Sequence, residues 1–118
     1  MREYEFRGKD IKTGWYHGLL CAIFTKFNSA SINQENGFFA VSLDTIGQYT
    51  GVQDSCGLKI FEGDIVRSTS DFGIGVVKFI QGSFYVEFSK SNLEYLCQED
   101  LEVIGNIYDN PELLEKVD

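Results

Sequence analysis

The chain has little of what several common classes of protein need. Proline, methionine, tryptophan and histidine each occur once in 118 residues. The three cysteines are widely spaced, and none forms a CxxC pair. A structural zinc site needs about four closely spaced Cys or His ligands, and no glycine-rich string matches a nucleotide-binding loop. The sequence therefore predicts no metal, no cofactor, and cysteines that act as small buried hydrophobic residues.

Long apolar runs are also missing. The longest covers residues 18–24, far short of the about 20 residues that a membrane-spanning helix needs. The N-terminus carries charges where a signal peptide has an apolar core, and an odd number of cysteines suits a reducing compartment. We expect a soluble cytoplasmic protein with no membrane partner.

Positive charge is scarce, since ten Lys and Arg stand against eighteen Asp and Glu and the net charge is −8. Binding to nucleic acid normally needs clustered basic side chains, so nonspecific DNA or RNA binding is disfavoured. One alternative is an acidic surface that imitates DNA. The other is a local basic surface on a small barrel, formed by Arg2, Arg7, Lys9, Arg67 and Lys78.

Aromatic residues are abundant, with 10 Phe and 6 Tyr. Phe, Tyr, Val and Ile suit a pleated, half-buried surface. The length suits one domain over residues 1–118 with a single core. The composition therefore predicts a mainly β protein.

Hydrophobic patterns locate most of the expected strands. The run over 15–27 predicts one strand bent at Gly18, with a helix over 19–27 as the alternative. Polar composition predicts a turn over 8–14 and an exposed loop over 28–36. Residues 46–50 suit a short strand or a connector, and no element is assigned to 89–100. The remaining strands are expected over 2–7, 37–43, 65–69, 75–80, 83–88 and 101–107.

Local turn chemistry marks the ends of these elements. Gln81-Gly82 predicts a hairpin turn between the strands expected over 75–80 and 83–88. Asn110 as N-cap and Pro111 as first helical residue predict a short helix over 109–115, which Leu113 and Leu114 would dock onto the barrel.

Two aspartates lie in turns of their own. Asp54-Ser-Cys-Gly57 and Glu62-Gly63-Asp64 both read as tight turns, in which Asp accepts bonds from backbone amides. We favour this structural role over an acid–base pair or a cation site. Gly105 is interpreted in the same way, as part of strand-end geometry.

Several strings, taken in order, carry a family likeness. They are Arg2 to Arg7, Gln48-Tyr-Thr-Gly51, Asp54 with Gly57, Phe61-Glu-Gly-Asp-Ile-Val66, Gly75-Val-Val77, Gly82-Ser-Phe-Tyr85 and Glu102 to Leu113. At these positions the chain resembles the YopX family of small phage and prophage proteins. Ser55-Cys56 departs from the polar or basic residues more usual there, without changing the turn.

The resemblance implies a β-dominated fold with an SH3-like barrel element and a bacterial or phage setting, and it brings no established biochemical activity. We therefore predict a mainly β (all-β/α+β) domain with an SH3-like barrel, additional strands and a short C-terminal helix.

The surplus of aromatic rings carries the functional hypothesis. Aromatic residues are enriched at protein interfaces, although a small barrel also fills its interior with large rings. We predict a non-enzymatic interaction or self-association module, with a protein partner or a second copy bound through Tyr49, Phe72, Tyr85 and Tyr108. An enzyme would need His17 to meet a turn carboxylate or a cysteine in one cleft.

Overall fold

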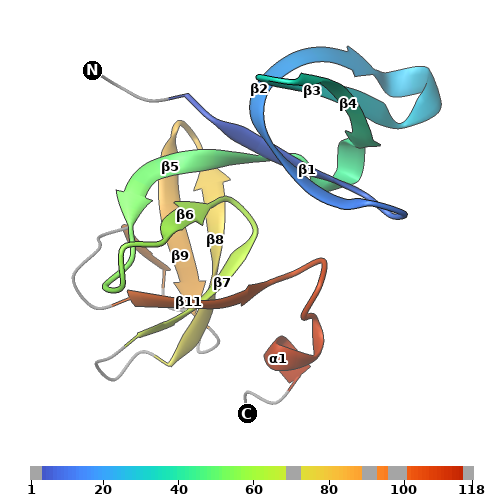
Figure 1. Cartoon of the computed structure of the whole chain (residues 1–118). Helices are drawn as coiled ribbons and strands as arrows, with labels where there is room; N and C mark the ends of the chain where they lie inside the picture. Colours follow the sequence, from blue (N-terminus) through green and yellow to red (C-terminus); the bar gives the residue numbers. More distant parts are fainter. Residues whose placement is uncertain (1–3, 69–72, 89–92, 96–100, 116–118) are drawn as a thin grey trace. The chain divides into compact units, whose positions relative to one another are not determined.

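A computed structural model describes residues 4–68, 73–88, 93–95 and 101–115 (Figure 1). The chain divides into two compact units, unit 1 over Met1–Tyr49 and unit 2 over Thr50–Asp118. Both are built from antiparallel strands with short helical turns. The predicted mainly β class is confirmed. A single domain over residues 1–118 would require the two units to unfold together. This stays a prediction.

Unit 1 is a curved sheet in the strand order β4-β3-β2-β1-β5. Its longest strand, β2, bends along its length (Figure 1). The strands and 3-10 turns are β1 Phe6–Asp10, β2 Gly14–Phe24, η1 Thr25–Phe27, β3 Ser29–Gln34, β4 Gly37–Ser42, η2 Leu43–Thr45 and β5 Gly47–Gln53. The strand expected over 15–27 is confirmed as β2, which excludes the helix alternative, although residues 25–27 form η1 instead.

The exposed loop expected over 28–36 is wrong, because these residues form β3. Ala30 and Ile32 are completely buried and alternate with polar Ser and Asn residues that point the other way. Together with Val41 of β4 they form the core of unit 1. The two-residue alternation was present in the sequence, but the polar composition hid it.

The first strand also lies later than expected, because β1 runs from Phe6 to Asp10 and the chain reverses over residues 11–13. Gly8 is a strand residue here and not part of a turn. A side-chain Cβ at Gly8 would lie 2.5 Å from Cγ2 of Val41. Glycine therefore allows β1 to pass close over the core, which is a packing role that local turn rules do not reveal.

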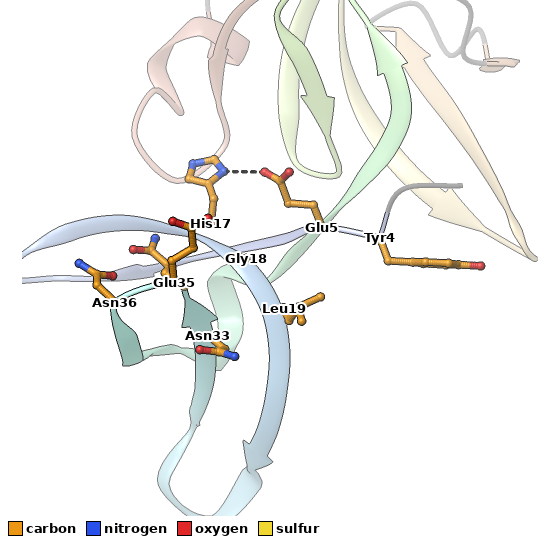
Figure 2. A pocket seen from close by; sticks show the side chains of 9 residues that line it. Tyr4, Glu5, His17, Gly18, Leu19, Asn33, Glu35 and Asn36 are labelled. Atoms are coloured by element: carbon orange, nitrogen blue, oxygen red, sulfur yellow. Dashed lines mark ion pairs between the residues drawn. The ribbon is translucent and has the colours of Figure 1, made fainter. Parts of the chain in front are cut away.

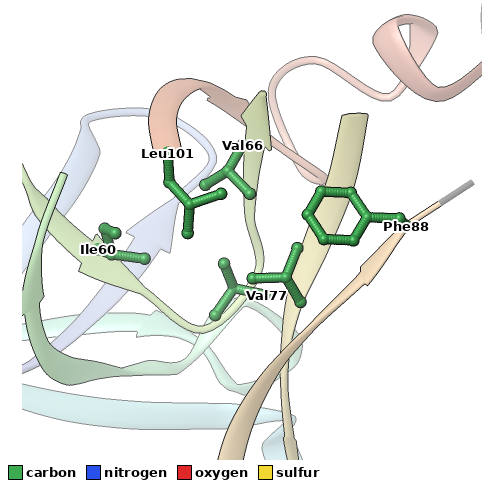
Figure 3. Close-up of a cluster of buried hydrophobic side chains, with 6 residues drawn as sticks. Ile60, Val66, Val77, Phe88 and Leu101 are labelled. Atoms are coloured by element: carbon green, nitrogen blue, oxygen red, sulfur yellow. The ribbon is translucent and has the colours of Figure 1, made fainter. Parts of the chain in front are cut away.

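Unit 2 holds a five-stranded sheet in the order β10-β9-β8-β7-β11, and β6 lies beside β5. Its elements are β6 Lys59–Phe61, β7 Asp64–Ser68, β8 Ile74–Ile80, β9 Ser83–Phe88, β10 Leu93–Tyr95, β11 Leu101–Asn106 and α1 Glu112–Glu115. Figure 3 shows the core, formed by Ile60, Val66, Val77, Val86, Phe88 and Leu101.

The hairpin expected around Gln81-Gly82 is confirmed as β8 and β9. Both turn residues have positive φ, 49° at Gln81 and 87° at Gly82, as the common two-residue hairpin turn requires. Val86 and Phe88 point into the core while Glu87 is exposed. The local sequence was enough to predict this element.

The closed barrel is the part of the fold prediction that is wrong, since the strands form open sheets. In the described part of unit 2, β10 and β11 end the strand order and do not pair with each other. Closure would require the last strand to pair with the first. At the other edge of this sheet, the pairing of β11 with β7 shifts register between Val103 and Gly105.

The C-terminal helix is present but shorter than expected. It starts after Pro111, and Asn110 uses its side chain differently: Oδ1 accepts a bond from the backbone N–H of Asn106 at 3.3 Å. Of the two leucines expected to dock, Leu113 is half-buried and Leu114 is exposed.

Candidate functional site

A groove of about 790 Å³, open to solvent, lies on unit 1 (Figure 2). It is lined by the N-terminal segment, by β2 and by the end of β3 with its following turn, including Tyr4, Glu5, His17, Asn33 and Glu35. Most of these side chains are polar, so the groove suits hydrogen bonding more than burial of an apolar ligand.

His17 and Glu5 form an ion pair at the edge of this groove, with 3.5 Å between Nδ1 and Oε2 (Figure 2). The β1–β2 hairpin explains the contact, since its register pairs Arg7 with His17 and so places Glu5 diagonally across from the histidine. Sequence analysis missed this pair. The register of the β1–β2 hairpin would have revealed it, but this register follows from a turn over residues 11–13, and the sequence predicted the turn over 8–14.

Covalent catalysis would need a nucleophile within hydrogen-bond reach of the histidine. The described groove lining contains no Ser, Thr, Cys or Lys, and besides the carboxylates it offers the Tyr4 phenol. Across the described residues, no group of three or more His, Cys, Asp or Glu is placed to hold a metal ion.

The basic side chains of the nucleic-acid alternative are engaged in internal contacts. In unit 1, the Arg7 guanidinium lies 4.8 Å and the Lys9 ammonium 5.9 Å from the centre of the Trp15 ring, within cation–π range. In unit 2, Arg67 pairs with Glu102 and Lys78 with Glu87. Arg2 lies outside the described residues.

Unit 1 also exposes large apolar side chains. We call five of them, from β2, η1 and β4, the apolar surface of unit 1. Phe27 is 74% and Phe38 is 70% exposed, and the other three are half or more exposed. The members are Leu19, Ile23, Phe24, Phe27 and Phe38. Such residues mark interaction sites when several lie close together.

The strand registers bring these residues together in two places. Leu19 of β2 lies opposite Asn33 of β3, which lies opposite Phe38 of β4, so one row crosses three strands on the same face. Ile23, Phe24 and Phe27 follow one another at the tip where β2 passes through η1 into β3. The meander of β2, β3 and β4 therefore presents apolar side chains both on a face and at a hairpin tip.

Asp54 joins its own turn to β11 in unit 2. Its Oδ1 accepts bonds from the N–H groups of Cys56 and Leu58, at 2.9 and 2.8 Å, and its Oδ2 accepts one from Val103 at 2.9 Å. The carboxylate is buried. Burial alone would raise the pKa of Asp54, but the backbone N–H groups of Val103, Leu58, Cys56 and Gly57 outweigh it and hold the pKa below its ordinary value.

The other residues assigned to turns also contact the backbone. Asp64 is buried, and its Oδ2 accepts a bond from the N–H of Phe61 at 2.8 Å. Gly57 and Gly63 have φ of 87° and 92°, which favour glycine. Gly105 lies at the β11 bulge, where an added Cβ would be 2.5 Å from Oδ1 of Asn110.

The described aromatic residues among those predicted to bind a partner are less exposed than the apolar surface of unit 1. Tyr49 is 6% exposed at the end of unit 1. Tyr85 and Tyr108 are half-buried in unit 2, and Phe72 lies outside the described residues. A role of these rings in binding stays a prediction, whereas the more exposed ring Phe27 was not selected from the sequence.

Comparison with known proteins identifies the family. The family model described as YopX protein matches residues 6–115, nearly the whole chain. The chain belongs to the YopX family. This confirms the resemblance seen in the sequence strings.

Two similar proteins illustrate the family and its fold. The SPbeta prophage-derived uncharacterized protein YopX of Bacillus subtilis (strain 168) is 39% identical over 72 residues, which cover 52% of this chain and 54% of that protein. The match thus spans about half the length of this YopX relative. The crystal structure of protein EF1440 from Enterococcus faecalis has a TM-score of 0.61 and 22% identity, covering 97% of this chain and 99% of that one. At this identity the second likeness shows the fold alone.

Among the described residues of this YopX-family chain, no helix combines the length and the apolar character needed to cross a membrane.

Proposed function

We propose that this YopX-family protein is a non-enzymatic interaction module of prophage type, which binds a protein partner through the apolar surface of unit 1. The observation that carries this proposal is the concentration of exposed large apolar side chains on one meander, headed by Phe27 and Phe38. Burial of such rings is worth about 1.5–3 kcal/mol each, so leaving them in water is costly unless a partner covers them.

The groove beside His17 supports binding more than catalysis. It is open, it is lined mostly by amides and carboxylates, and its lining offers the histidine no hydroxyl, thiol or amine nucleophile apart from the Tyr4 phenol. Since Leu19 lines this groove and also belongs to the apolar surface, polar and apolar contacts to one partner are available side by side. This arrangement resembles an apolar patch with a polar rim.

The test is partner capture from the native host with a tagged chain. We expect the wild type to retain a specific protein and the triple variant Phe24→Ser, Phe27→Ser, Phe38→Ser to lose it, because the variant removes the rings that a partner would bury. The matched control replaces Leu58 and Phe79 of unit 2, which are similarly exposed, with Ser. Circular dichroism verifies that each variant is folded.

Equal capture by the wild type and the triple variant would contradict the proposal. So would loss of capture in the unit 2 control alone, because this would move the contact surface to the other unit. Turnover of a substrate that is abolished by His17→Ala would instead support an enzyme.

A further inference from the structure

Strand β4 is the outer strand of its sheet, so one of its edges is available for pairing with another strand. It pairs with β3 along its full length, from Gln34 opposite Gly37 to Ser29 opposite Ser42, without a register shift. On its other side the strand order holds no neighbour among the described strands. An edge of this kind presents backbone N–H and C=O groups that can pair with another strand.

The protections that charged residues and proline give to an edge strand are absent from the sequence of β4. Its sequence, Gly-Phe-Phe-Ala-Val-Ser, contains no Lys, no other charge and no Pro. Proteins normally guard exposed edges with exactly such residues, or with a bulge that bends the strand away, and the β3–β4 ladder contains no bulge. Phe38 is also 70% exposed on this strand.

We infer that β4 is a self-association edge, which pairs antiparallel with β4 of a second copy about a twofold axis at Ala40, so that the two Ala40 residues lie opposite each other. This inference rests on the proposed function and names one partner for it. A twofold axis makes the two strands antiparallel and keeps equivalent faces on the same side. Phe38 and Ala40, which share a face, would then continue onto the same face of the partner copy.

The charge distribution favours a second copy over a charged foreign segment. The whole chain carries a net charge of −8, so two copies repel each other at long range. Locally the situation differs, because residues 28–34 and 36–43 carry no charge and only Glu35 interrupts them. Self-pairing of β4 therefore places no like charges opposite each other, which would be destabilising, and it offers nothing to a charged peptide.

The edge is also accessible in its second half. An open groove of about 420 Å³ is lined by Ala40, Val41 and Ser42 of β4 together with Asp10 and Ile11 of the β1–β2 turn. Ile11 is the most exposed large apolar side chain of the described residues, at 91%. A strand added beside β4 would cover part of this side chain as well.

Sedimentation equilibrium over a wide concentration range tests the inference. We expect the wild type to reach twice the 13.4 kDa mass of the chain and to associate more tightly as salt screens the net charge. Ala40→Lys places two ammonium groups close together across the axis, and we expect it to weaken dimerisation at least tenfold. Leu58→Lys, at an exposed position of unit 2, is the matched control and keeps the wild-type mass.

Disulfide cross-linking is a second measurement, and it does not require β4 to fold with a lysine at position 40. In a chain whose three cysteines are replaced by Ser, Ala40→Cys is expected to form a disulfide-linked dimer on mild oxidation, whereas Leu58→Cys in the same background is expected to form no disulfide-linked dimer. A disulfide needs Cα atoms within about 7 Å of each other, so rapid cross-linking reports the predicted axis directly.

A wild type that stays monomeric at every concentration overturns the inference, as does an Ala40→Lys variant that dimerises like the wild type. These results leave the proposed function standing if partner capture still depends on Phe24 and Phe27, which lie outside β4. Loss of a captured foreign protein in Ala40→Lys, with a monomeric wild type, would assign the edge to that protein and also overturn the inference.

Discussion

Unit 1 and unit 2 use their apolar residues in opposite ways. Unit 2 points six large or branched side chains into one core, including Phe88, and its described part exposes Leu58, Phe79 and Leu114. The fully buried cluster of unit 1 contains only Ala30, Ile32 and Val41, while most of the exposed large apolar side chains belong to this unit. Among the described residues, unit 2 therefore buries most of its large apolar side chains, whereas unit 1 leaves several of them exposed, as the proposed contact with a partner requires.

The polar contacts follow the same division. In unit 2 the buried carboxylates of Asp54 and Asp64 bond to backbone N–H groups and hold turns together. In unit 1 the side chains of Glu5 and His17 contact each other beside an open groove. A carboxylate that joins backbone segments stabilises the fold, whereas a pair at a groove edge remains accessible to a ligand.

The largest effect is expected from the core of unit 2. Phe88→Ala should lower the free energy of unfolding by about 3–5 kcal/mol, because a buried ring is replaced by a cavity. Urea unfolding followed by circular dichroism measures the loss. Phe79→Ala, at a half-exposed position of the same sheet where the ring contacts Phe84, is the control and should cost about 1 kcal/mol.

The same variant tests whether the units unfold together. Trp15 is the one tryptophan of the chain and lies in unit 1, so its fluorescence reports that unit alone. If the chain is a single domain, the Trp15 transition shifts together with the circular dichroism transition, since β5 runs without a linker across the boundary at residues 49 and 50. If Phe88→Ala leaves the Trp15 transition unchanged, the two units unfold independently and the chain consists of two domains.

A smaller effect is expected at Asp54. Asp54→Ala leaves the N–H groups of Cys56, Leu58 and Val103 without their acceptor and should cost about 3 kcal/mol at neutral pH. Because the pKa of Asp54 is lowered in the folded state, its contribution is present above the unfolded pKa of about 3.9 and is lost as pH falls through the folded pKa.

The stability of the wild type and of Asp54→Asn, measured by urea unfolding from pH 7 down to strongly acidic pH, checks this sign. The difference between them should shrink below about pH 4, where the Asp54 carboxyl of the unfolded chain begins to take up a proton, and should go on shrinking as the pH falls through the lower pKa of the folded state. A difference that stays constant with pH would mean that Asp54 acts by shape alone. Asp44→Asn in unit 1, whose carboxylate contacts the Asn28 side chain, serves as the comparison.

The smallest effect is expected in unit 1, where Gly18 lies against β3. A Cβ at Gly18 would be 2.1 Å from the backbone oxygen of Asn33, so Gly18→Ala should force the strands apart and cost about 1–3 kcal/mol. Trp15 fluorescence during urea unfolding measures it. Gly14→Ala, which meets no atom within 4 Å but has φ of 105°, separates backbone strain from crowding. A cost near zero at Gly18 would show that the sheet of unit 1 yields easily.

How much could be predicted depended on the range of the interactions. The β8–β9 hairpin was found because Gln81-Gly82 specifies its turn locally. The contact between Asp54 and Val103, 49 residues apart, could not be found in this way. The groove of unit 1 was missed for the same reason, since its residues come from three segments that only strand pairing brings together.

The sequence by itself determined the β class, the family likeness and the tight turns, because propensity and turn chemistry act between near neighbours. Only the tertiary structure decided that the polar stretch Ser29–Gln34 is a central strand, that Gly8 lies within a strand, and that the sheets stay open. The tertiary structure also decided which aromatic rings are buried and which are exposed to water. The physical reason is that burial depends on the partners across a sheet or a core, and these lie far apart along the chain.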